Sequence, residues 1–262
     1  MSVGSAAGER VLADWGGSGP LIVLVHGDSP VAELTWLGQR ALRSDSRVQV
    51  LKRRGFGMRA SLPIDAGRDA DDLLAHLTGP AHLVGHSHGG VVALLAAARR
   101  PAVVRSVTVV EPPLFQFADD RVDVRQLLSR VEALLAGELD GSSATAVSEL
   151  LSNTGDVPAD PRFERLCRKF AAGVRPWHHP VGELVGAQCP VSVVCGGWSA
   201  AYTAVCDRLA ARLHGYRLTV HGHGHFPHHA RQRFNGHVLR TLSGVGEQLA
   251  GVTHRGVLWL AK

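Results

Sequence analysis

The stretch AHLVGHSHGGVVALLAAARR, residues 81–100, decides the fold. Its first six residues form an apolar run that predicts a buried strand, and residues 89–100 form a strongly apolar helical pattern. Between them, GHSHG (85–89) fits the G-x-S-x-G pattern. A serine at such a strand–turn–helix corner sits in a strained backbone, and the helix N-terminus favours developing negative charge beside it. The stretch therefore predicts a nucleophilic Ser87 at the end of a buried strand.

Outward from this corner, strand and helix patterns alternate along most of the chain. Short apolar runs rich in β-branched residues predict strands buried on both faces, and residues 11–19 predict an edge strand with a glycine turn. This alternation implies an α/β fold with a mostly parallel sheet flanked by helices. The expected strands are 20–27, 47–55, 104–110, 190–195 and 216–222, and further helices are expected at 68–77, 204–213 and 234–245.

The alternation stops after the strand that ends near residue 110. The residues that follow hold two amphipathic helical patterns, at 124–137 and 163–173, with polar turns between them. An insertion of this kind between two buried strands suggests a helical cap over one end of the sheet. The predicted organisation is a core of residues 1–111 and 187–262 with a helical cap insertion at 112–186.

Three motifs occur in the order found in the α/β-hydrolase family, which this chain resembles from about residue 11 to 245. They are VLVHG (23–27), GHSHGG (85–90) and HGHGHF (221–226). The resemblance implies an eight-stranded sheet with the site above its C-terminal edge, Ser87 as the nucleophile and His225 as the general base. His225 holds the final place of the family's G-x-G-H pattern, and His223 is the alternative base.

The chemistry of these residues agrees with those roles. A serine hydroxyl is a poor nucleophile until a base takes its proton, and histidine titrates near neutral pH. An oxyanion intermediate needs two aimed N–H donors, and we expect the backbone N–H groups of Asp28 and His88. An ionised Asp28 that pointed inward would oppose the oxyanion. Its side chain therefore either turns away or caps the local turn with Ser29, or it contacts a polar or cationic group of the substrate.

The acid that normally orients the histidine is missing from its usual place. The family's loop after the strand at 190–194 usually carries an aspartate, and this chain has Ser199 there. Glu111 directly follows the strand at 104–110, at the same edge of the sheet, and some family members carry their acid after this strand. We therefore expect Glu111 as the acid. Asp207, or a Ser-His dyad without an acid, is the alternative.

Candidate pocket residues come from aromatic and histidine side chains near the cap and the site. Trp36, Trp177, His178 and Trp198 are the candidates for substrate contact, although ordinary packing is the commoner role for such side chains. The segment HGHGHFPHH (221–229) is dense in possible metal ligands, but its glycines and its match to the family's histidine loop favour catalysis. We therefore expect no metal and no cofactor. The four cysteines form no C-x-x-C pair and are expected to be free thiols.

The composition favours one globular domain and argues against several other classes. The 262 residues are 45% hydrophobic, and the net charge of +5 comes from scattered side chains, so no nucleic-acid partner is expected. The first residues lack a secretory signal pattern, and no apolar run is long enough for a membrane span. We expect a cytoplasmic protein that acts on a small molecule without a membrane partner, in an oligomeric state that the sequence does not reveal.

Three functions fit these features. The first is a serine hydrolase that cleaves an ester or thioester of a small, fairly apolar molecule through a Ser-His-Glu triad and an acyl-enzyme. The second is a biosynthetic tailoring enzyme on the same fold: a cyclase, a lyase or a chain-releasing thioesterase. The third is a non-catalytic ligand receptor. The intact Ser87 and His225 favour the first.

Overall fold

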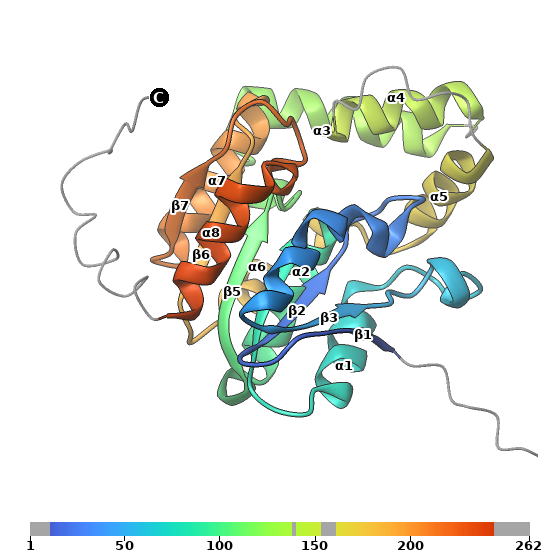
Figure 1. Ribbon diagram of the computed structural model, residues 1–262. Helices are drawn as coiled ribbons and strands as arrows, with labels where there is room; N and C mark the ends of the chain where they lie inside the picture. Colours follow the sequence, from blue (N-terminus) through green and yellow to red (C-terminus); the bar gives the residue numbers. More distant parts are fainter. Residues whose placement is uncertain (1–10, 138–139, 153–160, 244–262) are drawn as a thin grey trace, which may run out of the picture.

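A mostly parallel β-sheet forms the centre of the molecule (Figure 1). The computed structural model describes residues 11–137, 140–152 and 161–243. Across these residues the strand order is β1-β3-β2-β4-β5-β6-β7, with β1 antiparallel to β3 and all other neighbours parallel. The strands are β1 (Leu12–Gly16), β2 (Leu21–Val25), β3 (Arg47–Leu51), β4 (Ala81–His86), β5 (Val104–Val110), β6 (Val191–Cys195) and β7 (Tyr216–Thr219).

The sheet confirms the expected α/β architecture and corrects two details of it. The described residues contain seven strands, whereas the resemblance implied eight. A single strand, β1, precedes β2 there, because the chain turns at Gly16 and Gly17, both at positive φ, and returns directly into the sheet. In addition, β3 and β7 end before the expected strands at 47–55 and 216–222 do, so that residues 52–55 and 220–222 are loops at the carboxyl edge.

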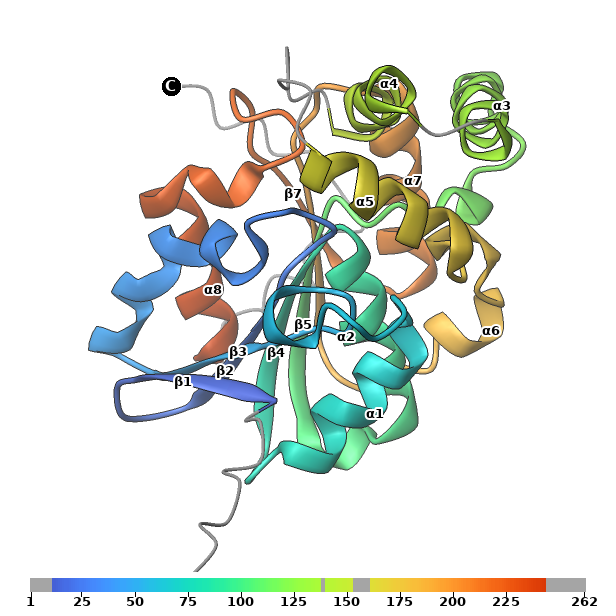
Figure 2. The same ribbon diagram turned by 90° about the vertical axis from the view of Figure 1, so that its right-hand side faces the viewer.

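Helices cover both faces of the sheet (Figure 2). One face is covered by α1 (Ala66–His76), α2 (His88–Arg99) and α7 (Ala200–Arg212), and the other by η1, a 3-10 helix (Ala32–Ser44), and α8 (Arg231–Leu242). Successive residues of β2 face the two helix layers alternately. Val23 and Val25 pack with α1 and α2, while Ile22 and Leu24 pack with η1 and α8. This alternation explains why β2 is apolar throughout its length.

The segment between β5 and β6 crosses the carboxyl ends of the strands (Figure 1). It contains α3 (Val122–Ala136), α4 (Gly141–Ser152), α5 (Pro161–Ala172) and α6 (Val181–Leu184). The two amphipathic patterns predicted α3 and α5, whereas α4 occupies a stretch that we expected to be a polar turn. Short 3-10 helices complete the chain: η2 (Gly57–Arg59), η3 (Pro101–Val103), η4 (Phe115–Phe117), η5 (Pro176–His178) and η6 (Pro227–His229).

The strand order reverses its direction between β2 and β4. From β2 the chain goes to β3 on one side, and β4 then pairs with β2 on the other side. In open α/β sheets, ligands bind outside the carboxyl ends of the strands at such a reversal. Within the described residues, no helix combines the length and the apolarity that crossing a membrane would require.

Candidate active site

Ser87 stands at the sharp turn between β4 and α2. Its backbone has φ 52° and ψ −126°, a strained conformation for a residue with a side chain, and its N–H donates to the Val110 carbonyl at 2.8 Å. Two glycines make room for the turn. A Cβ on Gly85 would stand 2.3 Å from the carbonyl oxygen of Gly89, and a Cβ on Gly89 would stand 2.2 Å from that of Val25. The corner that the sequence predicts is therefore built with the geometry that such a motif requires.

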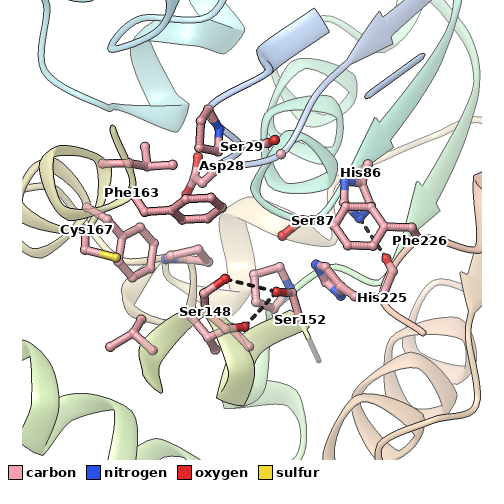
Figure 3. A pocket seen from close by; sticks show the side chains of 18 of the residues that line it. Asp28, Ser29, His86, Ser87, Ser148, Ser152, Phe163, Cys167, His225 and Phe226 are labelled. Carbon is pink, nitrogen blue, oxygen red and sulfur yellow. Dashed lines mark hydrogen bonds between the residues drawn. The ribbon is translucent and has the colours of Figure 1, made fainter. Parts of the chain in front are cut away.

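A cavity of about 110 Å³ opens beside Ser87 (Figure 3). One side comes from the loops after β2 and β4 and the other from α4 and α5, so the segment between β5 and β6 helps to enclose it. Its wall includes Asp28, His86, Ser87 and His225 and is otherwise mostly apolar, with Val147, Leu151, Phe163, Leu166, Phe170, Trp177 and Phe226.

His225 lies in the loop after β7, with its ring buried against Glu111. The His225 Nδ1 atom is 3.4 Å from Glu111 Oε2, which is longer than an ordinary N–H···O hydrogen bond. A neutral imidazole that donates from Nδ1 to this carboxylate keeps the lone pair of Nε2 free to accept a proton. His225 and Ser87 both line the cavity, and Figure 3 shows the imidazole beside the serine hydroxyl. The two side chains therefore face the same cavity.

Glu111 is fully buried and is held by the loop that follows β6. Its Oε1 atom accepts from the backbone N–H of Gly196, and its Oε2 atom accepts from the indole of Trp198 at 3.0 Å. The φ of Glu111 is 47°, in the left-handed region, and its N–H donates to the Val194 carbonyl. This bend directs the carboxylate across the end of β6 toward His225. The loop where the family usually carries its acid therefore supplies donors to an acid from the neighbouring strand.

The alternatives to Glu111 and His225 have other surroundings. Ser199 is the N-cap of α7, and its hydroxyl accepts from the Tyr202 N–H at 3.4 Å. Asp207 is exposed and forms an ion pair with Arg217 at 2.8 Å. His223, the alternative base, is exposed and lies outside the cavity wall.

The side chain of His86, the residue before Ser87, contacts the backbone of His225. His86 Nε2 lies 2.8 Å from the carbonyl oxygen of His225. Burial, together with the nearby His228 and His225, holds the pKa of His86 well below its ordinary value, so the ring is neutral. Because a carbonyl only accepts, the proton of this neutral ring is on Nε2. His86 thus fixes the loop that carries His225.

The loop after β2 approaches Ser87 closely. A Cβ on Gly27 would stand 2.8 Å from Ser87 Cβ, so only glycine allows this approach. The next residue, Asp28, lines the cavity, and His88 is the first residue of α2, where a backbone N–H has no acceptor within the helix. The two expected oxyanion donors therefore belong to residues on either side of the nucleophile.

The Asp28 carboxylate has partners within the protein. It accepts from Nδ1 of His88 at 2.8 Å and from Arg53 at 2.8 Å. Burial alone would raise the pKa of Asp28, but His88 and Arg53 hold it below its ordinary value. Arg53 has a fully buried side chain and also pairs with Asp69 at 3.0 Å. Of the two expectations for Asp28, this arrangement favours a side chain that turns away from the reacting centre.

Three of the four expected pocket residues lie elsewhere. Trp177 is in the cavity wall, but Trp36 is fully buried in the core beneath η1 and α8. Trp198 lies behind His225, where it bonds to the acid, and the side chain of His178 is 51% exposed on the surface. The expectation for these three is corrected, because nearness in sequence to a motif does not tell which side of a loop or helix faces the cavity.

The sequence interpretation missed much of the apolar wall and its few hydroxyl groups. Ser148 and Ser152, one turn apart on α4, reach the cavity, and their hydroxyl oxygens lie 3.5 Å apart (Figure 3). Tyr202 on α7 also lines it, and its hydroxyl donates to the Leu151 carbonyl at 2.9 Å. A signal for α4 existed in the apolar spacing of Ala144 and Val147, but the many serines in the stretch obscured it.

One group of described residues could offer ligands to a metal ion. Oxygen and sulfur atoms of Glu111, Cys195 and Cys206 lie within 4.8 Å of one another. The hydrogen bond with Cys195, and burial, raise the pKa of Cys206 well above its ordinary value, so this thiol stays protonated. Both carboxylate oxygens of Glu111 already accept hydrogen bonds. The hydrogen bonds that Glu111 accepts suit a carboxylate that orients a histidine better than one that binds a metal ion.

Sequence comparisons place these features among known proteins. Residues 22–236 match a family model described as the alpha/beta hydrolase family. A curated relative, the pimeloyl-[acyl-carrier protein] methyl ester esterase of Chromobacterium violaceum, is 31% identical over 137 residues. The match covers 52% of this chain, and the chain spans about half, 54%, of the length of that relative.

Solved structures share the fold at low sequence identity. A meta-cleavage product hydrolase superposes with a TM-score of 0.68 at 18% identity, over 89% of this chain and 94% of that one. A carboxylesterase from Bacillus subtilis gives a TM-score of 0.58 at 18% identity, over 89% of this chain and 87% of that one. At these identities the likeness concerns the fold alone.

Proposed function

This chain belongs to the alpha/beta hydrolase family, and we propose that it is a serine hydrolase that cleaves an ester or thioester of a small, fairly apolar molecule. Membership leaves the reaction open, because one fold carries many activities. The observation that carries the proposal is the arrangement of three groups, two of which line the cavity. Ser87 stands at its strained corner, His225 lies beside it, and the buried carboxylate of Glu111 lies behind His225.

In the proposed mechanism, Ser87 attacks the carbonyl carbon while His225 takes its proton. Glu111 orients the imidazole and stabilises its charged form. The backbone N–H groups of Asp28 and His88 stabilise the oxyanion of the tetrahedral intermediate. His225 then protonates the leaving group, and water, activated by the same histidine, releases the acid from the acyl-enzyme. The long contact between His225 and Glu111 is of the kind that shortens once substrate is bound.

The lining of the cavity supports a small, uncharged acyl group. Its wall is mostly apolar, and its one carboxylate, Asp28, is engaged by His88 and Arg53. No lysine or arginine is among the described residues that line it, so a free carboxylate on the substrate would lose its hydration without a cationic partner. The name of the Chromobacterium relative describes an esterase, which supports an ester as the reacting bond.

We further propose that residues 112–186 act as the cap that selects the substrate. The segment reaches the cavity through α4, α5 and the turn at Trp177. Substrate choice would then follow changes in these apolar side chains and leave the triad intact. This division of labour fits an insertion that leaves the order of the sheet undisturbed.

Burst and steady-state kinetics with p-nitrophenyl butyrate test the proposal. Ser87→Ala should abolish turnover, and Glu111→Gln should lower kcat by about 10²- to 10⁴-fold, the effect of depriving a histidine of its orienting acid. Ser199→Ala is the matched control. It should leave kcat near that of wild type and lower the stability by about 1 kcal/mol, because it removes the N-cap of α7.

Two results would contradict the proposal at different points. A Glu111→Gln variant with wild-type kcat would remove the carboxylate from the mechanism and leave a dyad. A wild-type protein that shows no burst and resists labelling of Ser87 by a fluorophosphonate would favour the receptor or the tailoring enzyme.

A further inference from the structure

The two residues with the proposed oxyanion donors are joined through their own side chains. Nδ1 of His88 lies 2.8 Å from Oδ2 of Asp28, although the two residues are 60 positions apart in the chain. Both backbone N–H groups must aim at one point beside Ser87 for an oxyanion to be stabilised. A bond between the side chains fixes the distance between the loop after β2 and the first turn of α2.

A buried arginine anchors the same loop from behind. One terminal nitrogen of Arg53 donates to Oδ1 of Asp28 at 2.8 Å and also to the His26 carbonyl at 3.0 Å, so it holds the loop at two points. The Nε atom of Arg53 donates to Asp69 of α1 at 3.0 Å. The chain of contacts therefore runs from α1 through Arg53 and Asp28 to His88 on α2.

The buried charges of this network carry a free-energy cost as well as a stabilising contribution. Buried ion pairs often contribute no more than well-packed apolar side chains, because their charges lose hydration. Here the second terminal nitrogen of Arg53 and Nε2 of His88 are buried, with no hydrogen-bond partner among the described residues. A site that needed only to be filled could hold apolar residues without loss of stability. The arrangement is better explained by what it positions.

We propose that the Asp28–His88 hydrogen bond, backed by Arg53, sets the spacing of the two oxyanion donors. Asp28 and His88 are then positioning residues through their side chains, in addition to the catalytic role of their N–H groups. Both oxygens of Asp28 are occupied by protein donors, so the carboxylate is not a receptor for a substrate cation. The inference rests on the proposed hydrolase function.

The experiment breaks the Asp28–His88 bond by changing His88, because the His88 side chain does not line the cavity. His88→Leu removes the donor but keeps a side chain of similar bulk, and His88→Asn restores an N–H near the position of Nδ1. Asp72→Asn is the matched control, because it loosens another ion pair of α1, with Arg54 at 2.7 Å, without touching Arg53 or the pair. Each variant is assayed for kcat and KM with p-nitrophenyl butyrate, for the inhibition constant of butaneboronic acid, and for its melting temperature. The boronate forms a tetrahedral anion on the serine and so reports directly on oxyanion stabilisation.

The proposal expects a loss that is specific to the transition state. Removal of a whole oxyanion donor costs about 10²- to 10³-fold in kcat, so a misplaced donor in His88→Leu should cost about 10- to 10²-fold. KM should change by less than about threefold, and the boronate constant should rise by the same factor as kcat falls. His88→Asn should recover most of this loss. Asp72→Asn should lower the melting temperature while keeping kcat within about threefold of wild type.

Two outcomes overturn the proposal. One is a His88→Leu variant with wild-type kcat and boronate affinity, and the other is an Asp72→Asn variant that loses both as His88→Leu does. Failure of the hydrolase function itself is distinct, because wild type would then neither turn over ester nor react with a fluorophosphonate.

Discussion

Glu111 combines three features that a surface glutamate would lack: full burial, a φ of 47°, and hydrogen bonds to both carboxylate oxygens. A left-handed backbone at a residue other than glycine costs free energy, of order 1 kcal/mol, and persists where the surroundings fix it. Here it is fixed by the bond to the Val194 carbonyl and by the donors of Gly196 and Trp198. The strain is the consequence of turning a carboxylate from the end of β5 toward His225.

Trp198→Phe tests how much of this orientation comes from one donor. The substitution removes the indole N–H that bonds to Glu111 and leaves a ring to pack beside Tyr202. A hydrogen bond worth about 1 kcal/mol corresponds to about a fivefold change in rate, so kcat should fall by about 3- to 10-fold with KM nearly unchanged. Steady-state kinetics measure this.

The same substitution at Trp15, which packs beneath Arg40 and away from the cavity, should leave both constants unchanged. Equal kinetics for Trp198→Phe and wild type would mean that Gly196 and the backbone hold Glu111 without help.

The residues that sequence reasoning found are those that stand at fixed places in a motif or directly after a strand. Ser87 follows β4 and Glu111 follows β5, so their edge of the sheet could be predicted from the alternation of elements alone. The contacts of Trp198 and Arg53 depend on loops whose course no local pattern determines. Their partners lie 87 and 25 residues away, respectively, in the chain.

The turn between β4 and α2 is an element in which backbone packs on backbone. The first turn of α2 lies against the end of β2, and Gly89 is the point of contact. Gly89→Ala would bring a Cβ to 2.2 Å from the Val25 carbonyl oxygen and 2.5 Å from that of His26, and neither atom can rotate away. Although alanine is the better helix former, we expect a loss of about 3 kcal/mol or more in the free energy of unfolding.

Gly90→Ala is the matched control for urea denaturation. The Cβ at this neighbouring position would meet nothing closer than 3.4 Å, an ordinary contact, so its stability should stay within about 1 kcal/mol of wild type. Equal tolerance at the two positions would mean that the close packing of α2 on β2 is not required.

At the same scale, the strands were easier to predict than the helices over the cavity. The central parallel strands β2, β4, β5 and β6 are largely buried on both faces and are therefore short, mostly apolar runs with clear ends. The helix α4 has the sequence GSSATAVSELLS, in which serine and threonine favour turns, and only Ala144 and Val147 are buried. Its helical state comes from packing against α3 and α5, which a local pattern cannot reveal.

Taken as a whole, the molecule has an interior unusually rich in histidine. Burial lowers the pKa of His26 to about 3 and that of His237 to about 4, and it holds the pKa of His86 and His228 well below the ordinary value. Below pH 6.5 the unfolded chain binds protons at these rings that the folded chain does not. Stability is therefore complete above pH 6.5 and falls as the pH decreases. Between pH 7.5 and 5.5 we expect a loss of roughly 1 kcal/mol for each ring.

Urea denaturation at the two pH values measures this loss, and His237→Phe provides a control. Phenylalanine can stack on Tyr216 as His237 does, 5.6 Å between ring centres, but it cannot bind a proton. The variant should lose roughly 1 kcal/mol less than wild type over the same range. A stability that is constant from pH 7.5 to 5.5 would contradict the assignment of these rings as neutral in the fold.

The position of Glu111 also limits how modules could be exchanged between this protein and its relatives. Glu111 is the last residue before the segment 112–186. A chimera joined at residue 112 would therefore attach a foreign chain directly to Glu111. Leu114 is fully buried, and its N–H donates to the Pro112 carbonyl at 2.8 Å. The three residues after Glu111 therefore help to hold Glu111 in place. A graft that begins beyond Leu114 would leave Glu111 with the residues that support it, whereas one that begins at residue 112 would replace them.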